Sequence, residues 1–169
     1  MTKTKKATRK KTYRDTYRYV FLCLHAKDLD PEEITKKLNI KPDFAFKRGI
    51  LKDKNGNIKR HKNGSPIKMA YGQWILNAHV HKNSGLETRI KNIVKQIKPK
   101  RKALQQIVKK INADLTIAVE PHRDLYIAGY LFSGKLLNEF TSLGIDIDVS
   151  IHIPEKMEEF FKEHKLKRK

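Results

Sequence analysis

Lysines recur at helical spacing in one stretch of this sequence. Lys91, Lys95 and Lys98 follow one another at i, i+4 and i+7, which places their side chains on one side of a helix. The next three basic residues come directly after a proline: Lys100, Arg101 and Lys102. A row of cations that advances about 1.5 Å per residue can contact successive phosphates of a nucleic acid. The pattern predicts a phosphate-binding surface on this helix.

The basic character extends over the whole segment 89–110, which contains nine Lys and Arg and no Asp or Glu. A charge run is often only a solvated face, but lysine-rich coding bias would raise Glu as well, and Glu is scarce here. A like-signed block of this length favours a surface that binds a polyanion.

A second basic segment, 47–68, holds eight Lys and Arg and one acid, Asp53. Its dipeptides Asn55-Gly56 and Asn63-Gly64 accept positive φ angles and predict one or two exposed hairpins. Three cations on this predicted arm are further candidates for phosphate contact: Lys59, Arg60 and Lys62. Lys far outnumbers Arg in the chain, so backbone contact is expected rather than base readout. Tyr13, Tyr17 and Tyr71 are close to basic residues and could stack on bases, although such tyrosines are more often core or edge aromatic residues.

The composition agrees with an anionic partner. The 169 residues include 38 Lys and Arg against 18 Asp and Glu, a net charge of +20 with a pI near 10.0, which excludes a DNA mimic. One cysteine, Cys23, excludes a disulfide framework and a cysteine-built metal cluster and fits a reducing, cytoplasmic location. The apolar run 19–26 is interrupted by His25 and lacks a cleavage site, and no segment reaches membrane-spanning length, so no membrane partner is expected.

Two pairs of residues could bind a metal ion. His79 and His81 share one face of a predicted strand, and so do Asp146 and Asp148, which could also serve a nuclease. Each pair lacks a third ligand, and polar alternation on an exposed strand accounts for both. Cys23 is expected to be an inert buried thiol. Phosphate loops, nucleophile elbows and zinc-protease motifs are absent, so no metal, cofactor or catalytic residue is predicted, and a non-enzymatic role is favoured.

The elements that position these residues follow from periodicity and caps. Asp30 followed by Pro31 predicts a short helix that ends near Asn39. Ser84 begins a capping box for a long helix that Pro99 interrupts and that resumes to about residue 112, and Ser133 caps another that Gly144 ends. Strands are predicted over 17–25, 73–81, 115–119, 125–132 and 145–153.

These elements form an internal repeat of strand, capped helix and extended segment. The expected fold class is α+β, a two-layer ferredoxin-like sandwich built from two β-α-β units, with a mostly antiparallel sheet, helices on one face and an added basic hairpin. One domain is expected over 16–155, between basic tails at 1–15 and 156–169. Met157, Phe160 and Phe161 could form a last amphipathic turn.

Several short motifs are similar to those of a known family: Leu38-Asn39-Ile40-Lys41-Pro42-Asp43 followed by Gly49, then Gly72-Gln73-Trp74, the helix at Ser133 and the closing strand Ile145-Asp146-Ile147-Asp148. The chain resembles the bacterial family called domain of unknown function 4279, with Asn39 where that family usually has glycine. The resemblance implies an α+β fold and a bacterial or phage origin. It supplies no reaction and no catalytic residue.

The expected function is that of a non-enzymatic nucleic-acid-binding accessory protein, of a bacterial defence or mobile-element system, that contacts the phosphate backbone of DNA or RNA. One alternative is a protein-interaction module, of immunity or inhibitor type, whose basic face docks on an acidic partner or a nucleoprotein. The other alternative is a metal-dependent nuclease that uses Asp146 and Asp148.

Overall fold

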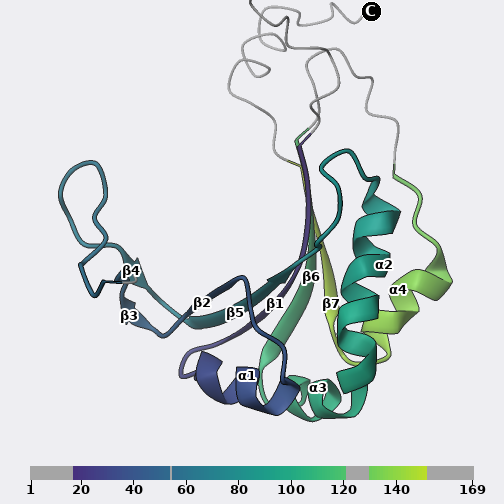
Figure 1. Ribbon diagram of the computed structural model, residues 1–169, viewed down its shortest axis with the longest axis horizontal. Helices are drawn as coiled ribbons and strands as arrows, with labels where there is room; N and C mark the ends of the chain where they lie inside the picture. Colours follow the sequence, from purple (N-terminus) through teal and green to yellow (C-terminus); the bar gives the residue numbers. More distant parts are fainter. Residues whose placement is uncertain (1–16, 54, 121–129, 152–169) are drawn as a thin grey trace, which may run out of the picture.

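The computed structural model describes residues 17–53, 55–120 and 130–151. A five-stranded sheet in the order β2-β5-β1-β6-β7 is packed on one face by helices (Figure 1). The strands are β1 Tyr17–Ala26, β2 Phe44–Phe46, β5 Gly72–Asn77, β6 Asn112–Glu120 and β7 Asp146–Ile151. Three of the four pairings are antiparallel, and β6 with β7 is parallel. The predicted α+β class with a mostly antiparallel sheet is confirmed.

Strand β1 is the middle strand because its sequence is apolar on both faces. Val20, Leu22 and Leu24 point into the core under the helices and are at most 3% exposed. Cys23 is buried from the other face. The core continues through Trp74 on β5, which is fully buried. Both edges of β1 are hydrogen-bonded, one to β5 and the other to β6.

The helices are α1 Pro31–Leu38, α2 Leu86–Ile97, the 3-10 turn η1 Lys98–Lys100, α3 Arg101–Val108 and α4 Gly134–Thr141. Asp30 caps α1 as predicted, since its Oδ1 accepts a hydrogen bond of 2.9 Å from the backbone N of Glu32. The helix ends where Asn39 adopts φ 49°, the left-handed region. Pro99 lacks a backbone N–H, and the chain changes there from α to 3-10 geometry, as the interrupted periodicity predicts.

Two β-α-β units organise the chain. Strands β1 and β2 are both antiparallel to β5, which lies between them, so they run parallel and are connected through α1. Strands β6 and β7 are parallel neighbours, and α4 precedes β7. The predicted internal repeat therefore corresponds to two parallel strand pairs. The arrangement is compatible with a ferredoxin-like layout.

The basic segment between β2 and β5 forms an arm. It begins with the short strands β3 Gly49–Ile50 and β4 Lys68–Met69, and two isolated bridges, Lys52 with Ile58 and Arg60 with Pro66, extend it. Gly56 and Gly64 have φ angles of 84° and 83°, as the two Asn-Gly turns require. The arm projects on the side of the sheet opposite to α2 and α4 (Figure 1). The prediction of exposed basic hairpins is confirmed.

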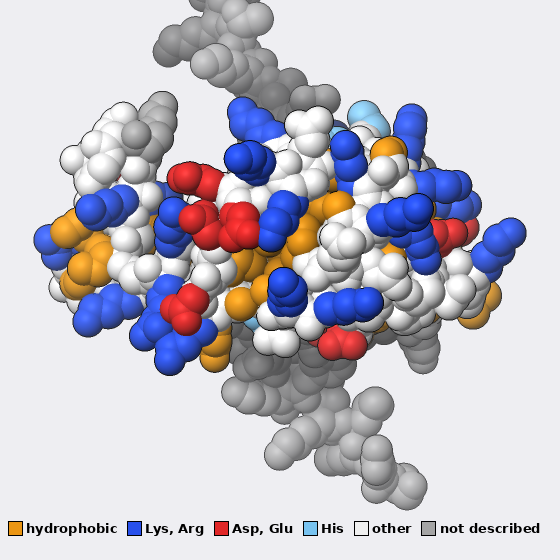
Figure 2. Space-filling view, turned by 90° about the horizontal axis from the view of Figure 1, so that it is seen from below, with side chains coloured by type: hydrophobic (Ala, Val, Ile, Leu, Met, Phe, Trp, Pro, Cys, Tyr) orange, Lys and Arg blue, Asp and Glu red, His pale blue; other side chains and the backbone are white. Residues whose placement is uncertain are grey.

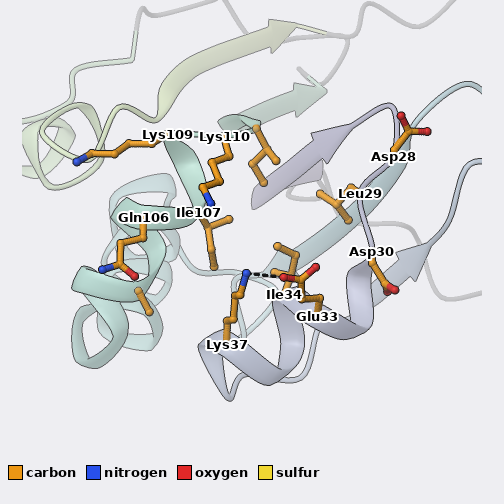
Figure 3. Close-up of a pocket in the computed structure, with 12 residues that line it drawn as sticks. Asp28, Leu29, Asp30, Glu33, Ile34, Lys37, Gln106, Ile107, Lys109 and Lys110 are labelled. Carbon is orange, nitrogen blue, oxygen red and sulfur yellow. Dashed lines mark hydrogen bonds and ion pairs between the residues drawn. The ribbon is translucent and has the colours of Figure 1, made fainter.

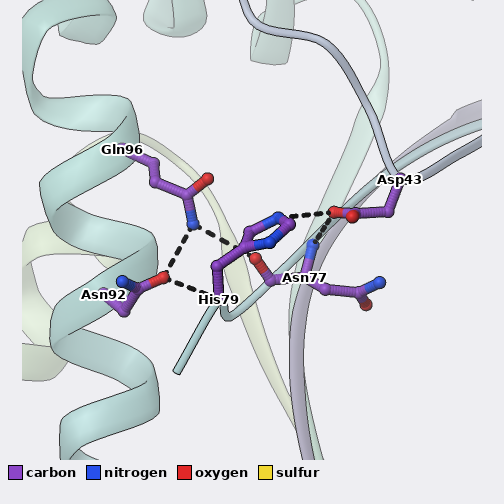
Figure 4. A network of polar contacts seen from close by, with 5 residues as sticks. All are labelled: Asp43, Asn77, His79, Asn92 and Gln96. Carbon is purple, nitrogen blue, oxygen red and sulfur yellow. Dashed lines mark hydrogen bonds and ion pairs between the residues drawn. The ribbon is translucent and has the colours of Figure 1, made fainter. Parts of the chain in front are cut away.

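Strand β5 is shorter than predicted. It ends at Asn77, so His79 and His81 lie in the following loop and do not share a strand face. The chain leaves the sheet because polar side chains hold it elsewhere: Asn92 Oδ1 accepts a hydrogen bond from the backbone N of His79 at 2.9 Å, and Asp43 Oδ2 lies 3.1 Å from its Nε2 (Figure 4). Gln96 Nε2 donates to the Asn77 carbonyl at 3.1 Å, which anchors the end of β5 to α2.

Three other expectations differ from the structure. The N-cap of α2 is Gly85, not Ser84, and no side-chain cap bond forms there, so the capping-box prediction is wrong. Ser133 is the N-cap of α4 but makes no side-chain cap bond. The strand predicted over 125–132 lies largely outside the described residues, and residues 130–132 are not in a strand.

Both predicted tails, and the turn predicted at Met157, Phe160 and Phe161, lie outside the described residues. Within the described part of the chain, no helix has the length and apolar content to cross a membrane.

Candidate nucleic-acid interface

A column of lysines runs along one side of α2, η1 and α3, and we call it the helical stripe: Lys91, Lys95, Lys98 and Lys102. All four side chains are exposed, and Lys100, next to Lys98 in η1, is half-buried. Lys91 forms an ion pair of 2.7 Å with Glu87, one turn earlier. The other three stripe lysines have no ion-pair partner among the described residues. The stripe is therefore a row of cations available to an external anion.

Arg101 is engaged within the fold. Its Nη1 lies 3.0 Å from Glu139 Oε2, and its Nη2 donates to Ser142 Oγ at 2.7 Å, so it fastens α3 to α4. These contacts are made across 38 and 41 residues of sequence and could not be read from the basic run. Arg101 contributes positive charge near the stripe, but its guanidinium is already held by two partners.

Arg89, the first cation of the basic block 89–110, is internal. It is 9% exposed, and its guanidinium donates to the carbonyls of Lys82 at 2.7 Å and Ser84 at 3.2 Å. Burial, followed by the nearby Arg18, lowers its pKa. Arg89 holds the loop that precedes α2 against the helix, so it is not part of an anion-binding surface.

The arm presents the second predicted group, and Lys59, Arg60 and Lys62 are all exposed there. Arg60 Nη1 donates to the Gly64 carbonyl at 2.8 Å and closes the second turn. Asp53, the one acid in segment 47–68, is occupied by the first turn, because its Oδ1 accepts from the backbone N of Asn55 and of Asn57. These hydrogen bonds lower its pKa.

The stripe and the arm do not form one surface. The helices cover one face of the sheet, whereas the arm projects on the other side (Figure 1). Seen from below, an apolar hollow with both acidic and basic side chains around it lies between the arm and the far end of the molecule (Figure 2). This separation could not be predicted from the sequence, because it is set by the order of the strands.

The hollow is a cleft of about 610 Å³ between α1 and α3 (Figure 3). Its apolar lining includes Leu29, Ile34 and Ile107. The three carboxylates on its rim each have a partner in the chain: Glu33 with Lys37, Asp30 with Lys47 at 3.1 Å, and Asp28 with Arg48 at 3.6 Å. Hydrogen bonds from the backbone N of Glu32 and from Lys47 lower the pKa of Asp30. Each carboxylate on this rim is thus balanced by a cation of the same chain.

We call the face of the sheet away from the helices the open face; the predicted sheet, with helices on one face, already left this other face to solvent or a partner, but its aromatic residues were not singled out from the sequence. Residues paired across strands share a face, so one row runs Phe44, Ile75, Cys23, Asp114, Asp146. No described helix covers this face, and it carries aromatic residues on β1, on β2 and just before β5: Tyr19, Phe21, Phe44, Phe46 and Tyr71. The sequence does place aromatic residues at alternate positions of β1 and β2, but this alternation does not tell which face of the sheet the helices cover.

Polar groups on the open face pair with one another. His25 Nε2 lies 3.0 Å from Asp114 Oδ1, and the His25 ring meets Tyr71 edge-on, with centroids 6.2 Å apart. Burial, with a smaller contribution from Asp114, raises the pKa of the Cys23 thiol to about 12, which fits the prediction of an inert thiol. Asp146 and Asp148 are exposed on β7. Over the described ranges, no three His, Cys, Asp or Glu side chains are grouped to hold a metal ion.

The comparisons with known proteins identify a family and are silent on the activity. No curated protein and no solved structure matches this chain significantly. One family model does match, over residues 15–154, which is most of the chain and includes every described element. The chain belongs to the family described as domain of unknown function (DUF4279).

Proposed function

We propose that this protein binds nucleic acid by contacting its phosphate backbone, and that it does so without catalysing a reaction. The observation that carries the proposal is the helical stripe: exposed lysines in one column, three of them without an ion-pair partner among the described residues. Unpaired lysines exposed in a row repel one another, and a polyanion removes that repulsion while releasing its counterions. The net charge of +20 strengthens the attraction at long range.

The arm is a second phosphate-contacting element under this proposal. Because it lies on the other side of the sheet from the stripe, the two regions would contact different segments of a polymer, or different molecules. A basic face could instead dock on an acidic protein, and a complex that survives nuclease treatment would favour that alternative. An accessory role in a bacterial defence or mobile-element system fits the proposal and is tested only after binding is established.

The experiment compares two variants with the same change in net charge. The stripe variant carries Lys95→Gln, Lys98→Gln and Lys102→Gln; the control carries Lys36→Gln, Lys82→Gln and Lys135→Gln, which are exposed but scattered over α1, a loop and α4. Affinity for a duplex and for a single strand is measured by fluorescence anisotropy from about 50 to 200 mM salt.

The slope of log affinity against log salt should fall by about 0.9 for each phosphate that a variant no longer neutralises, so the stripe variant should lose about 2 to 3 from its slope and the control much less. Equal changes in both variants would mean that only net charge matters, and the stripe would be rejected as a site. Absence of any complex with the unmodified protein at about 50 mM salt would reject nucleic-acid binding altogether.

A further inference from the structure

The open face of the sheet has aromatic rings in contact with solvent next to a concentration of cations. Phe44 on β2 is 61% exposed and Tyr71, just before β5, is 52% exposed. Large apolar side chains exposed on a folded domain usually mark a binding surface. We propose that this face binds single-stranded nucleic acid, with bases stacked on the rings of Phe44 and Tyr71 and phosphates held by the arm.

The arm begins where these rings lie. Strand β3 follows β2 after two residues, and β4 ends two residues before β5, so the base of the arm adjoins both Phe46 and Tyr71. A shallow hollow of about 400 Å³ lies at this base and is lined by Arg48 and Lys68 together with Ile50 and Met69. Cations and apolar side chains thus meet at the edge of the aromatic face, as a ligand with both phosphates and bases requires.

The charges near the rings select a polyanion over a protein partner. Four arm lysines have no ion-pair partner among the described residues: Lys52, Lys59, Lys62 and Lys68. The acid of this segment, Asp53, is held in its own turn. Protein interfaces are depleted in lysine, whereas single-strand binding surfaces combine a positively charged groove with aromatic rings.

The charges on the open face indicate where the single-stranded nucleic acid would lie. Asp114, Asp146 and Asp148 are on β6 and β7, and their carboxylates would repel phosphates. The rings are on β2 and at the start of β5, beside the arm. The polymer is therefore placed along the β2 and β5 edge. A duplex cannot use this surface in the same way, because its bases are stacked on one another and do not present their faces.

This inference goes beyond the proposed function, since it concerns another face of the molecule than the stripe, and it rests on that function in taking nucleic acid as the ligand and the arm as a phosphate-contacting element. The test uses the full chain with Phe44→Leu and Tyr71→Leu, which keep apolar side chains but remove the rings. The matched control is Tyr130→Leu, which removes a ring that is 38% exposed just before α4, outside the sheet. A rescue variant, Phe44→Tyr with Tyr71→Phe, keeps both rings. The emission of Trp74, the one tryptophan, reports that each variant is folded.

The probes are oligo-dT and oligo-rU of about 15 nucleotides and a duplex of the same length. The leucine variant should bind both single strands at least about tenfold more weakly than the unmodified protein does, and its affinity for the duplex should stay within about twofold. The Tyr130→Leu control and the rescue variant should bind each probe within about twofold of the affinity of the unmodified protein. A loss confined to one of the two oligonucleotides identifies which of the two polymers the face prefers and supports the inference.

Single-strand affinity unchanged in the leucine variant would overturn the inference, and so would an equal loss for the duplex or failure of the rescue variant. The stripe variant separates the two proposals. If its salt slope is unchanged while the leucine variant loses single-strand affinity, the stripe fails and the open face stands; the reverse result leaves the stripe and removes the open face.

Discussion

Trp74 Nε1 donates a hydrogen bond to Thr35 Oγ1 at 3.0 Å, which joins β5 to α1 across 39 residues. The indole is fully buried, and its N–H has this acceptor in place of water. Thr35 Oγ1 in turn donates to the Pro31 carbonyl at 2.8 Å, so one hydroxyl serves both partners.

Thr35→Val should therefore destabilise the fold by about 1 to 3 kcal/mol, because valine matches threonine in shape but leaves the indole N–H without an acceptor. Urea unfolding followed by Trp74 emission measures the change. Thr116→Val on β6 is the control, since that residue lies on the open face, where valine suits a strand. Equal stability of the two variants would show that the hydrogen bond contributes nothing.

Gly72 is required by a close backbone approach. A Cβ built at this position would lie 2.5 Å from the Leu29 carbonyl oxygen, and that oxygen belongs to the turn that leads into α1. Gly72→Ala should cost about 1 to 3 kcal/mol, because backbone must move to make room. Gly134→Ala, where nothing lies within 4 Å, should be neutral or stabilising by up to about 1 kcal/mol. Thermal unfolding of the two variants, followed by circular dichroism, measures both changes in stability.

Arg101 and Glu139 are expected to act as a pair that stabilises the packing of α3 on α4. Their side chains are 40% and 37% exposed, so a double-mutant cycle with Arg101→Gln and Glu139→Gln should give a coupling of only about 0.5 to 1 kcal/mol. Because the guanidinium is occupied, Arg101→Gln should change the salt slope of nucleic-acid binding less than Lys98→Gln does. A larger slope change for Arg101 would mean that it releases Glu139 to bind phosphate.

Cys23 should react slowly in the folded protein. Its pKa is raised from 9.0 to about 12, so at pH 8 the thiolate is roughly 1000-fold scarcer in the native state than in the unfolded chain. Labelling with a disulfide reagent at about pH 8 should be roughly 100-fold to 1000-fold slower without urea than with it, and Cys23→Ala should not label. Rapid labelling of the native protein would contradict a buried thiol.

The raised pKa of Cys23 also makes the stability of the fold depend on pH. The folded-state pKa lies above the unfolded value, so the stability that comes from burying the neutral thiol is fully present below about pH 9 and is lost as pH rises through 12. Urea midpoints at about pH 8 and pH 10.5 should fall more in the unmodified protein than in Cys23→Ala. Identical falls would assign the alkaline loss to other groups.

Neutralising the acids of the open face should strengthen single-strand binding if the polymer lies on that face. Asp146→Asn with Asp148→Asn removes two exposed carboxylates without removing a described ion pair. A gain of a few-fold in affinity for oligo-dT is expected at about 50 mM salt, and it should disappear as screening shortens the range of the repulsion. Lys27→Gln with Glu32→Gln, which alters exposed charges in the turn after β1 and on α1, serves as the control for handling and folding.

Features that depend on neighbours in sequence could be predicted. Asp30 with Pro31 begins α1, the two Asn-Gly pairs turn the arm, Pro99 interrupts the long helix and the alternation after Gly144 marks β7. Each of these rests on a cap, a ring constraint or a periodicity that acts within a few residues. The lysine spacing of the stripe belongs to the same class.

Features that depend on distant partners could not be predicted. Arg89 and Lys95 look alike in the basic block, but one is buried under the loop before α2 and the other is exposed. His79 continues the alternation of β5 and yet lies outside it, because Asp43 and Asn92 hold it. In both cases a hydrogen-bond partner from another element overrides the local pattern.

Composition and periodicity are properties of the chain alone, and they were enough to predict the fold class, the basic character and the lysine column. The placement of the arm and the stripe on opposite sides of the sheet, and the exposure of Phe44 and Tyr71, come from the packing of the folded chain. The reason is the strand order: which face receives the helices is set by packing between residues that are far apart in sequence, and no local pattern encodes it.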